Sequence, residues 1–217
     1  MLTTRRPLHA QSRRQSGDTL IEVLFAVTVF ALVVVGALSL MNQGTAASTR
    51  SLQITLVRQE IDNQAETLRF LSASYVSAYH KAYNPSTTDA TTSPAEEYFK
   101  TLRDIRSRGA TSVTKFGGTG TTCQTPPAGS FVFNPKLATY QPYDASKIAP
   151  ADTFSQLVYA TDNSITTAQG MWIEAVRSTP SGSTSYVDYR IRACWYPPGT
   201  GNPMNLGTIV RLYEPTS

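Results

Sequence analysis

The chain has 217 residues, of which 41% are hydrophobic, and it contains no long acidic or basic block, so most of it is expected to fold. Its net charge of +4 and pI near 9.1 would fit a nucleic-acid partner. However, four arginines and no acidic residue precede Gly17, and the rest of the chain carries equal numbers of basic and acidic residues. The basic pI therefore belongs to the first 17 residues and does not indicate a nucleic-acid-binding protein.

A long apolar run follows this basic start. Residues 23–41 contain no charged residue, and these 19 residues are long enough to cross a hydrocarbon core of about 30 Å as a helix. The next basic residue is Arg50, so the positive-inside rule places the N-terminus in the cytoplasm. The alternative is an ordinary secretory signal cut near Ala46-Ala47-Ser48, but the run is long for one and begins next to an acid, Glu22.

The residues around this acid carry a family resemblance. Gly17-Asp18-Thr19-Leu20-Ile21-Glu22 resembles the cleavage motif of type IV prepilins, in which glycine precedes phenylalanine or methionine, Ser or Thr, Leu, an aliphatic residue and glutamate. Five of the six positions agree, and Asp18 is the departure. The resemblance covers residues 1–45 and marks the chain as similar to type IV pilins and pseudopilins.

This resemblance implies processing and assembly. A prepilin peptidase would cut between Gly17 and Asp18 on the cytoplasmic side and leave the apolar helix attached. Glu22 would face the free α-amino group of a neighbouring subunit and set its register, since each charge is costly to bury alone. The alternative is a carboxylate favoured at a helix start by the macrodipole. The family methylates the residue at position 18; the aspartate leaves N-methylation open and favours a minor subunit.

The expected domain organisation follows the chain. Residues 1–17 form the cleaved leader, 18–44 the apolar transmembrane and filament-core helix, and 45–82 an amphipathic continuation, because no proline occurs before Tyr83. A continuous helix over 18–82 would be roughly 95 Å long. Within it, the glycine positions Gly36 and Gly44 favour either local melting or close helix contacts. The amphipathic half has an apolar stripe at three- and four-residue steps: Ile54, Val57, Ile61, Ala65, Leu68, Leu71 and Tyr75.

The remaining residues are predicted to form a connecting segment and a sheet. Residues 83–129 form a connection with a short helix over 94–108, opened by the capping box Ser93-Pro94-x-Glu96. Residues 130–217 form the head, where apolar residues at every second position of 187–195 give the clearest strand. Further strands are predicted at 171–176 and 208–213, and weaker ones at 131–133 and 157–159. We expect an α+β, pilin-like fold in which the long helix packs on a small antiparallel sheet of about four strands.

The two cysteines do not indicate a metal site. Cys123 and Cys194 are 71 positions apart, and His9 and His80 lie far from both, so no metal or cofactor is expected. In an exported head they would form one disulfide that ties the glycine-rich region 116–120 to the sheet; the alternative is two free thiols in a reducing compartment. No catalytic motif is present, and we do not expect an enzyme.

A basic patch is the remaining candidate site. Arg190 and Arg192 lie on one face of the clearest strand, and Arg177 and Arg211 lie on other predicted strands. If these faces coincide, four guanidinium groups could meet DNA or an acidic surface glycan. The stronger alternative is a solvated face in which Asp188 and Glu174 lie among the arginines.

These features predict a minor structural subunit of a type IV pilus or related filament. It would be anchored in the cytoplasmic membrane before assembly and exposed outside the cell afterwards, serving adhesion, twitching motility or DNA uptake. The expected partners are other pilin subunits through the N-terminal helix, prepilin peptidase, the inner-membrane assembly platform and membrane lipid. The alternatives are a pseudopilin of a type II-like secretion system and an uncleaved, single-pass membrane-anchored binding domain.

Overall fold

The computed structural model describes residues 18–79, 93–108, 122–177 and 185–215. The chain divides into two compact units, Met1–Ala47 and Ser48–Ser217, which are described separately. Helix α1, Asp18–Tyr79, runs through the described part of the first unit into the second. The expected leader and residues 80–92, which include the predicted end of the long helix, lie outside the described residues.

The part of α1 within the second unit is amphipathic. Six residues of the predicted stripe are buried in the main core, and Ile54 packs against it half-buried; the buried six are Val57, Ile61, Ala65, Leu68, Leu71 and Tyr75. Residues three and four apart lie on one face of a helix, which is why this spacing makes a continuous contact surface. The predicted amphipathic packing is confirmed.

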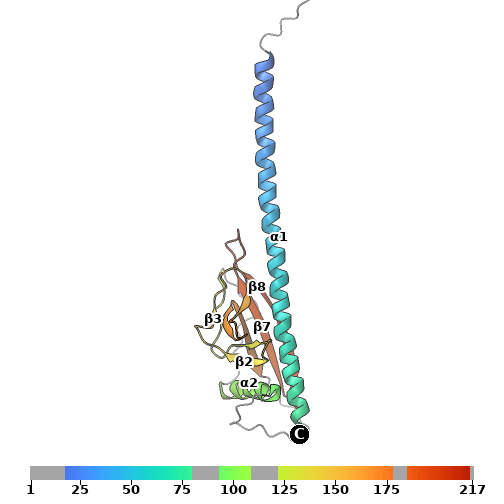
Figure 1. Ribbon diagram of the computed structural model, residues 1–217, viewed down its shortest axis with the longest axis vertical. Coiled ribbons are helices and arrows are strands. Elements are labelled where there is room, and N and C mark those ends of the chain that lie inside the picture. Colours follow the sequence, from blue (N-terminus) through green and yellow to red (C-terminus); the bar gives the residue numbers. More distant parts are fainter. Residues whose placement is uncertain (1–17, 80–92, 109–121, 178–184, 216–217) are drawn as a thin grey trace, which may run out of the picture. The chain divides into compact units, whose positions relative to one another are not determined.

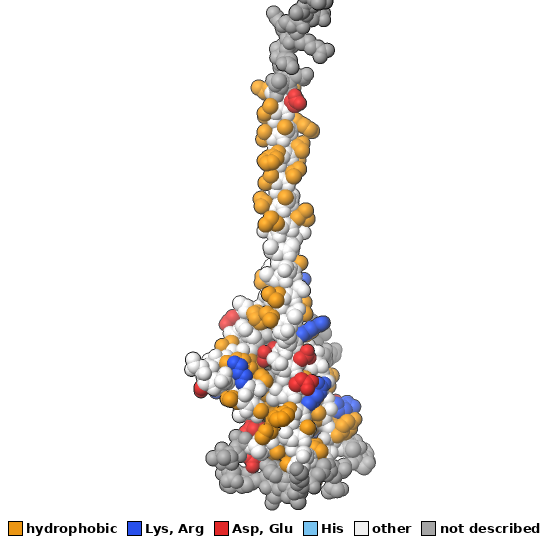
Figure 2. Space-filling model, turned by 45° about the vertical axis from the view of Figure 1, so that its right-hand side comes forward, with side chains coloured by type: hydrophobic (Ala, Val, Ile, Leu, Met, Phe, Trp, Pro, Cys, Tyr) orange, Lys and Arg blue, Asp and Glu red, His pale blue; other side chains and the backbone are white. Residues whose placement is uncertain are grey.

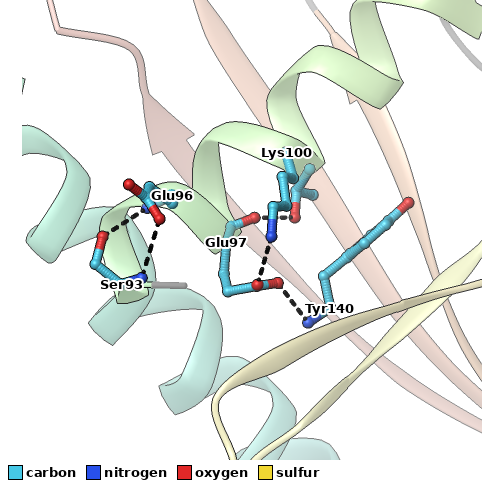
Figure 3. A network of polar contacts seen from close by, with 6 residues as sticks. Ser93, Glu96, Glu97, Lys100 and Tyr140 are labelled. Atoms are coloured by element: carbon cyan, nitrogen blue, oxygen red, sulfur yellow. Dashed lines mark hydrogen bonds and ion pairs between the residues drawn. The ribbon is translucent and has the colours of Figure 1, made fainter. Parts of the chain in front are cut away.

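Helix α2, Pro94–Arg108, covers the residues for which the sequence predicts a short helix. Its first turn is closed by the predicted capping box. The main-chain N–H of Glu96 donates to Ser93 Oγ at 3.3 Å, and the N–H of Ser93 donates to Glu96 Oε2 at 3.2 Å (Figure 3). These two bonds satisfy main-chain donors that a helix start leaves free. The buried side chains of Tyr98, Leu102 and Ile105 then join the main core.

The main sheet has the strand order β2-β1-β6-β7-β8, and all its described pairs are antiparallel (Figure 1). Its strands are β1 (Phe131–Asn134), β2 (Thr139–Pro142), β6 (Met171–Arg177), β7 (Tyr186–Trp195) and β8 (Met204–Tyr213). One face of β7 is buried in the same core as the α1 stripe, with Val187, Tyr189, Ile191, Ala193 and Trp195. The predicted alternation of this strand is confirmed, and the architecture is α+β.

A second, three-stranded sheet was not predicted. It has the order β3-β5-β4, with β3 (Ile148–Ala149), β4 (Gln156–Tyr159) and β5 (Ile165–Gln169), and its β3–β5 pair is parallel. A second core cluster joins the two sheets, and it includes Trp172 and Cys194 from the face of the main sheet that points away from α1. The expected α+β fold with a mainly antiparallel sheet is confirmed, and the predicted strand at 157–159 is β4 of the additional sheet, which covers the large apolar side chains on that face.

Gly170 makes the connection between the two sheets. It lies between β5 and β6 with φ of +61°, and a Cβ there would lie 2.2 Å from the carbonyl oxygen of Cys194. Its N–H donates to Ala149 O at 2.7 Å, and its carbonyl accepts from the N–H of Cys194 at 2.8 Å. The close approach of three backbone segments requires a residue without a side chain at this point.

Candidate functional site

The first unit presents an apolar helix surface. Every residue from 20 to 47 is exposed, including Phe25 at 70% and Leu32 at 74%, and hydrophobic side chains dominate the visible face of this part of the helix (Figure 2). The helix contains an 18-residue window with a mean hydropathy of 2.8, which by length and composition is apolar enough to cross a membrane. Apolar surface of this extent is stable in lipid or against other protein chains.

Two candidate residues lie at the start of this helix. Glu22 is exposed and directly precedes the uncharged residues 23–41. Helix α1 begins at Asp18, the residue that would become the new N-terminus after cleavage. Gly17 and the side chain of Asp18 lie outside the described residues. The cleavage at Gly17–Asp18 and the assembly role of Glu22 stay predictions, and both are compatible with a helix that begins at Asp18.

Cys123 and Cys194 form a disulfide, as predicted, with their Cα atoms 5.7 Å apart. The bond ties the segment before β1 to the end of β7, and the N–H of Cys123 donates a hydrogen bond to Tyr196 Oη at 3.0 Å. Residues 116–120, which the bond was expected to hold, lie outside the described residues. A disulfide in the head is typical of a protein exported to an oxidising compartment.

A cavity of about 240 Å³ lies beside this disulfide. Both cysteines line it, together with Tyr143, Ile148 and Trp172, and none of the described residues lining it is charged. A smaller cavity of about 60 Å³ borders Arg192. Among the described residues no group of three or more His, Cys, Asp or Glu side chains could hold a metal ion.

The four arginines of the predicted basic patch do not share one face. Arg177 lies opposite Val187 in the β6–β7 register, so it points to the α1 side of the sheet. Arg190 and Arg192 alternate with Val187, and Arg211 lies opposite Asp188, which places these three on the other side. Because strand side chains alternate between faces, four guanidinium groups cannot gather there. The predicted patch is wrong.

Three of these arginines are also neutralised by carboxylates. Arg192 is buried, and its Nε lies 3.2 Å from Glu174 Oε1, a carboxylate that also accepts from Trp172 Nε1 at 2.8 Å. The pairs Arg177–Glu214 and Arg211–Asp188 account for two more, the second through two hydrogen bonds of 2.7 and 2.8 Å. The carboxylates Asp188 and Glu174 do lie among the arginines, as the alternative expected, but its solvated face fits Arg211 and not Arg192, which is buried.

One titratable cluster comprises Glu60 of α1, Lys136 of the turn after β1 and Tyr159 of β4. Burial raises the pKa of Glu60, and the nearby Lys136 ammonium partly opposes this. Burial also raises the pKa of Tyr159 to about 12, and the Glu60 carboxylate adds to that shift. Lys136 Nζ lies 4.0 Å from the centroid of the Tyr159 ring, a cation–π contact. Because burial favours the neutral form of Glu60, its contribution to stability is expected to change with pH.

Two buried polar side chains, Gln64 and Glu97, hold helices to strands and were not predicted from the sequence. Gln64 is fully buried; its Nε2 donates to Phe133 O at 2.7 Å, and Phe133 N–H donates to its Oε1 at 2.8 Å. Glu97 is buried in α2 and accepts from the N–H of Tyr140 in β2 at 3.1 Å (Figure 3). Gln64 lies three residues after Ile61 on the apolar stripe, and a polar residue in such a stripe is the signal that could have identified it.

Comparisons with known proteins bear on the N-terminal region alone. The family model for the prokaryotic N-terminal methylation motif matches residues 12–38. This is the leader signature of type IV pilins and pseudopilins, and it covers the predicted cleavage site, Glu22 and most of the apolar run. No curated protein and no solved structure matches the chain. The motif supports a membrane-anchored subunit of the pilin or pseudopilin type.

Proposed function

We propose, from the N-terminal methylation motif that the chain carries, that it is a minor structural subunit of a type IV pilus or a related filament. The observation that carries the proposal is the coincidence of this motif with an exposed apolar segment of α1, residues 20–41. A plain membrane anchor needs an apolar helix but has no need of a glycine–x–Thr–Leu–Ile–Glu sequence directly before it. The motif and the helix together support a segment that lies first in lipid and then among other subunits.

The chemistry of this segment gives Glu22 a role in assembly. A carboxylate next to an apolar helix is costly to bury unless a positive charge neutralises it. Cleavage after Gly17 would create such a charge, the α-amino group of Asp18, on every mature subunit. A Glu22 carboxylate facing that amine on a neighbour would fix the axial register of two helices. The Asp18 carboxylate would compete for the same amine, which supports a specialised subunit rather than the bulk one.

The head would then function by contacting other molecules, and it would catalyse no reaction. It has two apolar core clusters, built from α1, α2 and the two sheets, and the Cys123–Cys194 disulfide, which suits a domain exposed outside the cell. Adhesion, twitching motility and DNA uptake are the roles that such a filament would serve. Prepilin peptidase and the inner-membrane assembly platform would be its partners before assembly, and other pilin subunits afterwards.

Incorporation into filaments tests this proposal. Glu22→Ala should leave the chain in the membrane and remove it from filaments sheared off the cell, as measured by immunoblotting both fractions. Glu66→Ala is the matched control, because Glu66 is an exposed carboxylate of the same helix whose partner, Arg69, lies on its own chain. Equal amounts of both variants in the sheared fraction would refute the assembly role, and absence of the unaltered chain from that fraction would refute the filament.

A further inference from the structure

The two edge strands of the main sheet, β2 and β8, differ in whether their outward main-chain N–H groups are free to form hydrogen bonds. At the β2 edge, Tyr143 N–H donates to Ser130 O across the β1–β2 pair, so the alternation of antiparallel bonding directs the main-chain groups of Tyr140 and Pro142 outward. Glu97 accepts the outward N–H of Tyr140, and Pro142 has no N–H (Figure 3). Both outward positions of β2 therefore lack a free donor, which protects this edge from further strand pairing.

The β8 edge has a different set of outward groups. Glu214 N–H donates to Ser185 O, and these residues continue the β7–β8 register by one pair. Hydrogen-bonded pairs alternate with non-bonded pairs in an antiparallel ladder, so β8 bonds to β7 through its even-numbered residues. The main-chain N–H and C=O groups that point away from β7 belong to Asn205, Gly207, Ile209, Arg211 and Tyr213.

These outward groups form no hydrogen bond with any described residue. The register of β8 with β7 runs from Met204 to Tyr213 without a bulge, and the strand itself contains neither lysine nor proline. Charged edge residues, prolines, bulges and short length are the usual devices that close an edge. Of these devices, β8 has only a charged residue, Arg211. Its guanidinium donates a hydrogen bond to Asp188 and lies over the Tyr186 ring.

We propose that the open edge of β8 binds an extended segment of a partner polypeptide as a sixth strand of the main sheet. Strand addition of this kind uses main-chain hydrogen bonds for affinity and alternate side chains for specificity. The outward groups recur at every second residue over the length of β8, which is the spacing that an extended strand requires. The proposal does not depend on the filament role.

The side chains along the edge indicate the partner's chemistry. On the α1 side, Leu206 and Leu212 are only half-buried against the core, so apolar side chains of the added strand would complete their cover. On the other side, Ile209 is 48% exposed and Tyr213 is 59% exposed. Arg190 lies across from Ile209 and forms no ion pair with a described carboxylate, because its neighbour Glu174 is taken by Arg192. The partner segment should therefore alternate apolar with polar and acidic residues.

A strand peptide tests the proposal directly. The probe is a fluorescent, end-capped decapeptide that alternates valine with threonine and glutamate, titrated against the full-length chain in nonionic micelles by fluorescence anisotropy. Ile209→Pro removes an outward N–H that β7 does not use, and proline is tolerated at such edge positions. Ile209→Val keeps the N–H and is the matched control. The unaltered chain should bind the peptide, Ile209→Pro about tenfold more weakly, and Ile209→Val within about twofold.

Two further readouts separate the edge from a nonspecific contact. A peptide N-methylated at alternate residues, which cannot donate toward β8, should not bind. In the free chain, the amides of 205, 207, 209, 211 and 213 should exchange with solvent faster than those of 206, 208, 210 and 212. Absence of peptide binding, equal binding by Ile209→Pro, or equal protection of the two amide sets would overturn the proposal. Pairing of the chain with itself through β8, seen by sedimentation in place of peptide binding, would overturn it as well.

Discussion

Replacing Gln64 by methionine tests how α1 is held on the main sheet. Gln64 is fully buried and bonds both the N–H and the C=O of Phe133, which is also fully buried. Those main-chain groups point away from β2, and β1 pairs with β6 at Phe131 alone. The carboxamide of Gln64 therefore takes the place of a strand at Phe133. Methionine fills a similar volume without either hydrogen bond.

The expected cost follows from the two groups left without partners. A buried main-chain donor or acceptor that loses its partner costs about 1–3 kcal/mol, so Gln64→Met should lower the free energy of unfolding by about 3 kcal/mol. Gln53→Met is the matched control on the same helix. Gln53 accepts one hydrogen bond, from Trp195 Nε1 at 3.2 Å, and its loss should cost about 1 kcal/mol.

Urea unfolding of the full-length chain in nonionic micelles would measure both variants. Trp172 and Trp195 are buried in the second unit, so their fluorescence reports on the head. Amide exchange at Phe133 gives a local check, since its N–H should exchange faster in Gln64→Met and remain slow in Gln53→Met. A Gln64→Met chain as stable as Gln53→Met, with Phe133 still protected, would refute the role given to Gln64.

The remaining predictions concern the disulfide, the buried ion pair and Glu60. The double substitution Cys123→Ala/Cys194→Ala removes a link between residues 71 positions apart. The loop-entropy model predicts that the free energy of unfolding falls by about 4 kcal/mol. A urea midpoint unchanged from that of the oxidised parent would contradict this prediction. Arg192→Met leaves the Glu174 carboxylate buried without its ion pair and should lower the free energy of unfolding by about 3–5 kcal/mol. Arg211→Met removes an exposed ion pair and should leave the free energy of unfolding nearly unchanged. Urea unfolding checks this, because the midpoint of Arg192→Met should lie below that of Arg211→Met. Because burial raises the pKa of Glu60 above its ordinary value of 4.5, its contribution is most favourable below that pH and falls as pH rises through the folded-state pKa. Glu60→Gln should therefore gain stability over the parent at pH 7 and gain little at pH 4, and equal differences at the two pH values would rule this out.

The elements that the sequence predicts best carry strong local signals. The capping residues Ser93 and Glu96 mark the start of α2, and the alternation of 187–195 predicts one buried face of β7. The disulfide follows from the absence of metal-ligand spacing around two cysteines in a chain expected to be exported. In each case a short stretch of residues contains most of the physical cause.

The features that were missed depend on distant segments. β3 has only two residues, and β5 reads ITTAQ, so neither has a run of apolar residues that would distinguish a strand from a loop. The second sheet exists because Trp172 and Cys194 project from the far face of the main sheet, which requires knowing the register first. The same is true of the arginines: the opposite facing of Arg177 and Arg190 follows from the β6–β7 pairing.

The mature N-terminus of the membrane-extracted chain is the most direct test of the central claim. Intact mass and the N-terminal peptide, both by mass spectrometry, should show a chain that begins at Asp18, with or without a methyl group, and retains the apolar helix. A chain that still carries residues 1–17 would contradict prepilin processing and identify a plain membrane anchor. A chain that begins after Ala47 would contradict it as well, and would identify an ordinary secreted domain.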